Sequence, residues 1–194
     1  MSSSIPRIAP LPPEQWTDQI RDVFALAEGA GARERGSRSN VVLTLANHPE
    51  LAAHFLAFST YLRKRSTLPA RLRELVILRV AWRYQCDYEW AHHVNLAGHL
   101  GVTPGECEAV RDGPEAGDWT ALERQILHAA DQLCEQGRID GPTWDALAAH
   151  FDKHLLLDLI FTVGGYATLA WALNSIGVEA GDAHLSKGLS TAAI

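Results

Sequence analysis

Apolar side chains recur every three or four residues along most of the chain, which is the spacing of one face of an α-helix. Proline at positions 13, 49 and 69 suits the first turn of a helix. No segment alternates between polar and apolar residues, and no hairpin turn separates two such segments, so a β-sheet is not expected. The pattern predicts an all-α bundle of about seven or eight helices. The helical segments are residues 12–28, 41–47, 49–65, 70–84, 87–100, 104–111, 119–136, 140–150 and 153–176.

The ends of these segments carry helix-capping residues. Asn40, Thr103, Asp118 and Asp140 each precede a helical repeat and have side chains that can accept a backbone N–H. Residues 1–12 contain three prolines and predict an extended arm, and residues 29–39 predict a loop rich in Gly and Arg. We divide the chain into an arm with a first helix (1–39), a main helical domain (40–178) and a loosely held polar tail (179–194).

Composition and charge exclude several classes of function. The 194-residue chain is 47% hydrophobic and 21% charged, as in an ordinary soluble globular protein. The net charge of -6 argues against a protein that binds the nucleic-acid backbone. A local basic cluster is interpreted as a solvated helix end and loop, with a local anion site as the alternative. The cluster consists of Arg63, Lys64, Arg65, Arg71 and Arg73.

The compartment is expected to be the cytoplasm. Cys86, Cys107 and Cys134 are an odd number at wide spacings, which is not a disulfide framework. The N-terminus lacks the charged start and apolar run of a signal peptide. The longest apolar stretch, residues 155–173, is interrupted by polar residues and glycines and is interpreted as a buried helix, so no membrane partner is expected.

The chemistry is concentrated in residues 71–99. Cys86, Glu89 and His93 are spaced by three and four residues, which places a thiol, a carboxyl and an imidazole on one helical face. Glu74 lies within the apolar run LRELVILRV and needs a partner if it is buried. If the two helices form an antiparallel hairpin, Glu74 lies near Glu89 and His93. Such a group predicts proton transfer.

Simpler interpretations apply to each residue alone. A single cysteine in a helix is usually a small buried hydrophobe, and a Glu–His pair is often a surface hydrogen bond. Glu89, His92, His93 and His99 are possible metal ligands. However, only Glu89 and His93 are well spaced for a shared ion, and no zinc-type motif is present, so we expect no metal and no cofactor.

At these residues the chain resembles the carboxymuconolactone decarboxylase family, which includes the AhpD-like alkylhydroperoxidases. The resemblance runs from about Asn40 to Val178 and is strongest in LPARLRELVILRVAWRYQCDYEWAHHVNLAGHLGVT. The AhpD-like pattern is Glu, then CxxC, then His four residues after the second Cys. Glu74, Cys86 and His93 match this pattern, but Glu89 replaces the second cysteine. A cycle through an internal disulfide is therefore not expected, because it needs a resolving thiol close by.

The resemblance implies an all-helical AhpD-like fold, a small-molecule substrate and a homo-oligomer, which we expect to be a dimer, trimer or hexamer. The leading hypothesis is a cofactor-free lyase or isomerase that acts on a small carboxylated or lactone substrate. His93 would be the general acid or base, Glu74 its orienting partner, Glu89 the second proton-transfer group, and Cys86 a pocket residue. The candidate substrate-binding residues are Arg71, Arg79, Arg83, Tyr88 and Trp90.

Two alternatives stay open. One is an AhpD-like peroxidase that uses Cys86 alone, through a sulfenic acid that an external thiol reduces. The other is a non-catalytic helical oligomer that keeps the scaffold of the family as a binding or assembly module.

Overall fold

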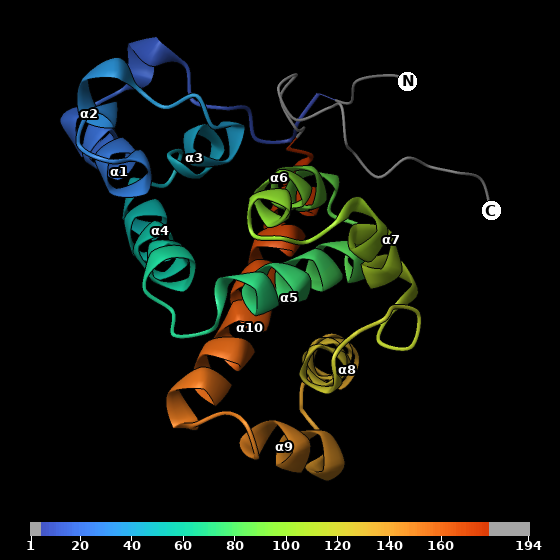
Figure 1. The fold of residues 1–194 in the computed structure, drawn as a ribbon. Helices are drawn as coiled ribbons and strands as arrows, with labels where there is room; N and C mark the ends of the chain where they lie inside the picture. Colours follow the sequence, from blue (N-terminus) through green and yellow to red (C-terminus); the bar gives the residue numbers. More distant parts are fainter. Residues whose placement is uncertain (1–4, 179–194) are drawn as a thin grey trace. The chain divides into compact units, whose positions relative to one another are not determined.

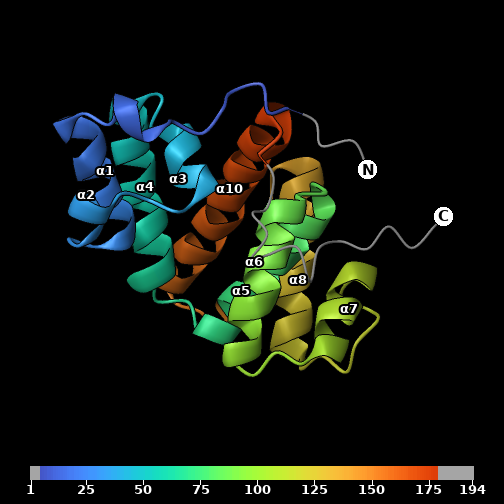
Figure 2. The same ribbon diagram turned by 90° about the horizontal axis from the view of Figure 1, so that it is seen from above.

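The computed structural model describes residues 5–178 and is helical throughout (Figures 1 and 2). These residues form ten α-helices, eight of which have at least seven residues, and contain no strand, which confirms the predicted all-α class. The helices are α1 (Asp18–Glu28), α2 (Ala32–Arg35), α3 (Asn40–Leu45), α4 (Pro49–Lys64), α5 (Ala70–Arg83), α6 (Asp87–His99), α7 (Pro104–Asp112), α8 (Ala121–Gln136), α9 (Gly141–Ala148) and α10 (Lys153–Ile176).

The described residues divide into two compact units. The first unit contains residues 5–65 and 173–178, and the second contains residues 66–172. The predicted boundary between residues 39 and 40 stays a prediction, and the predicted loose tail lies outside the described residues.

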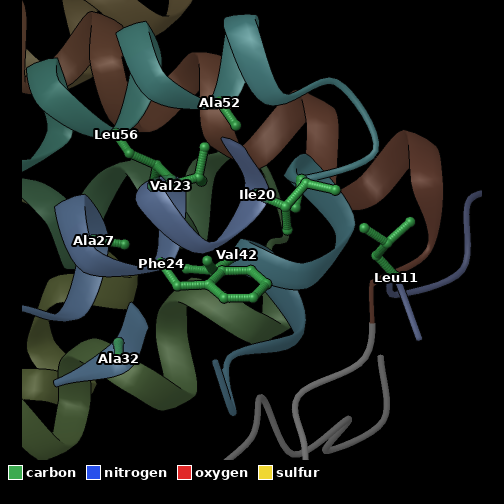
Figure 3. Close-up of a cluster of buried hydrophobic side chains, with 10 residues drawn as sticks. Leu11, Ile20, Val23, Phe24, Ala27, Ala32, Val42, Ala52 and Leu56 are labelled. Atoms are coloured by element: carbon green, nitrogen blue, oxygen red, sulfur yellow. The ribbon is translucent and has the colours of Figure 1, made fainter. Parts of the chain in front are cut away.

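The first unit is built around α1, whose apolar face packs on α3 and α4. Figure 3 shows this cluster, with Phe24 at its centre. The Trp16 ring contacts Phe24 edge to face, at 5.1 Å between centroids. The prediction of one helix over residues 12–28 is wrong at its start. A short 3-10 turn, Pro13–Gln15, ends at Trp16, and Thr17 then caps α1 by accepting the N–H of Ile20.

Two other helix starts differ from the prediction. Ser39, not Asn40, caps α3, and the expected loop over residues 29–39 contains the short helix α2. Thr120, not Asp118, caps α8, because Glu123 at the third helical position returns a hydrogen bond to the backbone N–H of Thr120. The same reciprocal arrangement confirms the predicted cap of α7 at Thr103.

The second unit is centred on α5, which is buried on almost every side and contacts α6, α7 and α8. Three hydrogen-bonded ion pairs connect α5 to α8 and join residues that are 52 positions apart in the sequence, and a longer contact joins Arg83 to Asp131 at 3.7 Å. This constant offset means that α5 and α8 run parallel in a fixed register. The pairs are Arg71–Glu123, Arg79–Asp131 and Arg83–Glu135.

Helix α10 contributes the remaining wall of the second unit. It is long and apolar enough to cross a membrane by length and composition, but half of its most apolar window is buried, and a core helix meets the same criterion. Leu159, Thr162 and Ala170 are fully buried, as expected for a core helix. Asp158 connects α10 to the turn before α5, because its carboxylate accepts the N–H and the hydroxyl of Thr67.

Candidate active site

The turn between α5 and α6 places the predicted site residues. Gln85 adopts a left-handed backbone conformation with φ at 52°, which is unusual for a residue other than glycine. The next N–H, of Cys86, donates to the carbonyl of Ala81 at 2.9 Å. The chain therefore reverses over two residues, and α6 returns along α5. Cys86 stands just before the first turn of α6 as its N-cap, and not inside the helix as the spacing had indicated.

The expected contact between the two helices is present. His93 Nδ1 lies 2.7 Å from Oε2 of Glu74, and both side chains are buried. The second oxygen of Glu74, Oε1, lies 3.6 Å from Nε of Arg73. One carboxylate thus faces an imidazole on α6 and a guanidinium on its own helix. With a proton on Nδ1 donated to Glu74, Nε2 is the His93 nitrogen that is left to accept a proton from a substrate.

Two aromatic rings fix the plane of the His93 imidazole. Tyr166 of α10 stands perpendicular to it at 5.0 Å between centroids, and His92 does so at 5.2 Å. Tyr166 is itself buried. Rotation of the His93 ring would therefore break the Glu74 hydrogen bond and both ring contacts together.

Glu89 is the most unusual group of the site. It is 2% exposed, and over residues 5–178 no N–H or O–H group bonds its carboxyl oxygens, which leaves the Cys86 thiol as the polar neighbour. Burial raises the pKa of Glu89 to about 8, although the Cys86 thiol partly offsets this effect. The carboxyl is therefore mostly protonated at pH 7 and can give up its proton near neutrality.

Cys86 is fully buried, and burial together with the neighbouring Glu89 carboxyl raises the pKa of its thiol well above the usual range. A thiolate at rest is therefore disfavoured. Glu74 thus lies against His93, and Cys86 lies beside Glu89. That the two pairs form one site, and that these residues are catalytic, stay predictions.

The five predicted substrate-binding residues do not form one group. Within the second unit, the guanidinium groups of Arg71, Arg79 and Arg83 are engaged by carboxylates of α7 and α8. Arg79 is buried and also donates to the carbonyls of Val110 and Arg111. These bonds favour a structural role for the three arginines over substrate binding.

The two predicted aromatic residues also differ from each other. Trp90 is 1% exposed, and the Arg111 guanidinium lies 4.8 Å from its ring and 5.3 Å from that of Trp82, so Trp90 is part of the core. Tyr88 is half-buried on the first turn of α6. For both residues, substrate binding stays a prediction.

Glu89, His92, His93 and His99 had been considered from the sequence as possible metal ligands. Over residues 5–178, no three His, Cys, Asp or Glu side chains gather in a way that could hold an ion.

Sequence reasoning missed Arg73, Tyr166 and Gln85 as residues of this site. Arg73 had been grouped with a basic cluster, although its position next to Glu74 was visible in the sequence. Tyr166 is 73 residues from His93, so only the tertiary fold brings the two together. The left-handed residue at 85 had no glycine or asparagine to indicate it.

Comparison with known proteins agrees with this arrangement. The sequence model of the carboxymuconolactone decarboxylase family matches residues 49–132, which include the whole Glu74–His93 hairpin. This segment therefore carries the sequence pattern of that family. No curated protein matches the sequence significantly.

Three solved structures share the fold of this chain over nearly its whole length. A protein from Ralstonia eutropha JMP134, described as an alkylhydroperoxidase AhpD core and an uncharacterized peroxidase-related protein, is 22% identical with a TM-score of 0.77. The match covers 93% of this chain and 96% of that one. A peroxidase-related protein from Silicibacter sp. TM1040 is 18% identical with a TM-score of 0.77, covering 95% and 96%.

The third structure is the debrominase Bmp8, in which a cysteine is replaced by alanine and 2,3,4-tribromopyrrole is bound. It is 16% identical with a TM-score of 0.76, covering 96% of this chain and 97% of that one. At these identities the likeness shows a shared AhpD-like fold. Proteins of this fold are therefore described by different activities, and the activity of this chain has to be inferred from its own site.

Proposed function

We propose that this member of the carboxymuconolactone decarboxylase family is a cofactor-free enzyme that moves protons on a small carboxylated or lactone substrate, by decarboxylation or isomerisation. The observation that carries the proposal is the buried carboxyl of Glu89, whose one polar neighbour among the described residues is the Cys86 thiol and whose pKa is raised to about 8. A group of this kind can both give and take a proton near neutral pH. A second proton-transfer group, His93, is held in place by Glu74.

The decarboxylation step can be written with these groups alone. The bond between the carboxylate carbon and its neighbour breaks, CO2 leaves, and the electron pair stays on the neighbouring carbon, conjugated with the lactone carbonyl as an enolate. Glu89 then donates its proton to that carbon and regains one from solvent before the next turnover. In an isomerisation, Nε2 of His93 removes a proton from one carbon and Glu89 supplies one to another.

Access to the site is the main requirement that this proposal adds. Glu74, Cys86, Glu89 and His93 are each at least 96% buried, so neighbouring side chains must move before a substrate can reach them. A site buried in this way would also suit the alternative of a non-catalytic helical oligomer. Against that alternative, an unpaired buried carboxyl is costly to keep in a protein that does not use it.

The test is to incubate the protein with carboxymuconolactone and follow the release of CO2. We expect His93→Ala and Glu89→Gln to lower kcat/KM by about 100-fold or more, and Glu108→Gln, which removes an exposed carboxyl from α7, to leave it unchanged. Since the protonated form of Glu89 is the acid, kcat/KM should fall as the pH rises above about 8. No release of CO2 by the wild type, or a full rate in Glu89→Gln, would refute the proposal.

A second candidate is reduction of a peroxide or of a halogenated ring by Cys86. It is favoured by the peroxidase-related and debrominase descriptions of the structural neighbours and by the position of the Cys86 thiol beside Glu89. In the peroxide reaction, Glu89 in its carboxylate form takes the thiol proton and the sulfur attacks the terminal oxygen of the hydroperoxide. The O–O bond breaks, and Glu89 returns the proton to the departing alkoxide. The products are an alcohol and a sulfenic acid, and an external thiol then reduces the sulfenic acid.

Cys86→Ala separates the two candidates. Proton transfer should survive this substitution, whereas thiol-dependent reduction should disappear. A dimedone-type probe should label Cys86 after peroxide treatment only if the second candidate holds. We also propose, from the family resemblance, that the protein is a cytoplasmic homo-oligomer, which light scattering on the purified protein would test.

A further inference from the structure

Helix α10 faces the hairpin of α5 and α6 along one row of its side chains. The row takes every fourth residue, Asp158, Thr162 and Tyr166, and residues with this spacing lie one above the other on a helix. At one end of the row, Asp158 accepts hydrogen bonds from Thr67, just before α5. At the other end, the Tyr166 ring stands against the His93 imidazole of α6. Thr162, between these two contacts, therefore faces the hairpin as well.

The height of Thr162 along α10 matches that of Glu74 along α5. The two helices run in the same direction, because a second contact joins Tyr84, just after α5, to Trp171 at 5.6 Å between ring centroids. Thr162 lies four residues, or about 6 Å, beyond Asp158, and Glu74 lies as far beyond the start of α5. The Thr162 side chain is therefore level with the Glu74 carboxylate.

The hydroxyl of Thr162 is buried without a hydrogen-bond partner. The residue is fully buried, and over residues 5–178 its Oγ1 neither donates nor accepts a hydrogen bond. A threonine inside a helix can bond the carbonyl four residues earlier, as Thr168 of the same helix does with Gly164 at 2.9 Å. Valine would fill the space of Thr162 with no unpaired group, so the hydroxyl is unfavourable for folding alone. A ligand that bonds this hydroxyl would account for it.

A hydroxyl at this level supplies an interaction that the proposed reaction needs. Loss of CO2, or removal of a proton, moves an electron pair toward the carbonyl oxygen of the lactone as the enolate forms. His93 donates its Nδ1 proton to Glu74, and Glu89 gives its proton to carbon, so neither holds that oxygen. A hydroxyl that donates to the carbonyl oxygen forms a stronger hydrogen bond as negative charge develops there.

We infer that Thr162 is a substrate-binding residue whose hydroxyl donates a hydrogen bond to the carbonyl oxygen of the substrate. This inference rests on the proposed function. The substrate carbonyl would lie between α10 and the hairpin, at the level of the Glu74–His93 pair. Because the hydrogen bond becomes stronger as the enolate forms, loss of the hydroxyl should lower kcat more than it raises KM.

The inference is tested first by the activity of three variants. Thr162→Val, which keeps the shape and removes the hydroxyl, should lower kcat for CO2 release from carboxymuconolactone by about 100-fold, with little change in KM. Thr162→Ser restores the hydroxyl and should recover most of the rate. The matched control is Thr168→Val, which removes a hydroxyl from the exposed face of the same helix and should leave kcat unchanged.

Two further measurements do not depend on turnover. The melting temperature of Thr162→Val should be no lower than that of the wild type, because no hydrogen bond is lost. A lower melting temperature would show that the hydroxyl has a partner in the folded protein and would overturn the inference. In titrations followed by protein NMR, Thr162→Val should bind γ-butyrolactone about fivefold more weakly than the wild type. Tetrahydrofuran, the same ring without the carbonyl, should bind the two proteins equally.

The outcomes distinguish this inference from the proposed function. Butyrolactone binding that is absent from the wild type, or equal in Thr162→Val, overturns the inference. If butyrolactone binding depends on the Thr162 hydroxyl but the wild type releases no CO2, the carbonyl-binding site stands and the proposed function falls. If the wild type releases CO2 and Thr162→Val keeps its full kcat, the proposed function stands and the role of Thr162 falls.

Discussion

Replacing Glu89 by glutamine should change how the stability of the protein depends on pH. The pKa of this carboxyl is about 8 in the folded protein and 4.5, the ordinary value of a glutamate, in the unfolded chain. Between these two values the folded chain keeps the proton and the unfolded chain has lost it. The folded state therefore binds more protons, and the free energy of unfolding falls as the pH rises through this window. Below pH 4.5 this decrease in the free energy of unfolding is absent, and above pH 8 it is complete.

The size of the effect follows from the two pKa values. From pH 5 to pH 8, ionisation of this one group lowers the free energy of unfolding by about 3 kcal/mol. Glutamine cannot ionise, so Glu89→Gln should lack this component and gain stability relative to the wild type as the pH rises. Because the amide is buried where the carboxyl found no partner, we expect the variant to be no more stable than the wild type at pH 5.

Urea denaturation at pH 5, 6, 7 and 8, followed by circular dichroism, measures the difference. Glu108→Gln is the control, since it removes the same chemical group from an exposed position. The range stops at pH 8 so that the cysteine thiols stay protonated in both states. Parallel pH dependence in the wild type and Glu89→Gln would show that Glu89 is not held protonated by burial, and the argument for an acid near neutrality would fail.

Three further predictions concern the scaffold and the thiols. Arg71→Ala, which removes the side chain that joins the capping boxes of α7 and α8, should lower the free energy of unfolding by about 2 kcal/mol, and an unchanged urea midpoint would contradict this. Gln85→Gly should keep stability within about 1 kcal/mol of the wild type, whereas Gln85→Val should lose more, because a β-branched residue fits the left-handed region poorly; equal melting temperatures would count against this. In the folded protein at pH 8, iodoacetamide should alkylate the half-buried Cys134 before Cys86, and peptide mass mapping that finds the reverse order would show the site to be open.

The sequence was sufficient for most helices, because their apolar faces, prolines and terminal glycines agree with one another. It failed where two nearby residues could each begin the same helix. Residues 12–17 offer two prolines and then a threonine, and the threonine cap begins the helix. Asp118 and Thr120 are both good caps, and only Glu123, three positions after Thr120, decides between them.

The candidate site was predictable where it is local and unpredictable where it depends on other helices. Cys86, Glu89 and His93 lie within eight residues of sequence, and a hairpin is a short-range expectation, so their proximity to Glu74 could be predicted. The carboxylate partners of the α5 arginines lie 52 residues further along the chain. Without those partners, the sequence cannot distinguish an arginine bound in an ion pair from one whose Nε lacks an acceptor, and for that reason Arg73 was overlooked.

The parallel register of α5 and α8 bears on how the chemistry of this scaffold can be changed. Three ion pairs at one constant offset hold α5 against sliding or turning, and none of them involves a residue of α6. The side chains at positions 86 and 89 can therefore be exchanged while the frame that carries Glu74 stays in place. A variant library restricted to these two positions, with the α5 arginines kept, should sample new reactivities at a small risk to folding. Exchanging Glu89 for cysteine would then change the reactive group while the frame that carries Glu74 is retained.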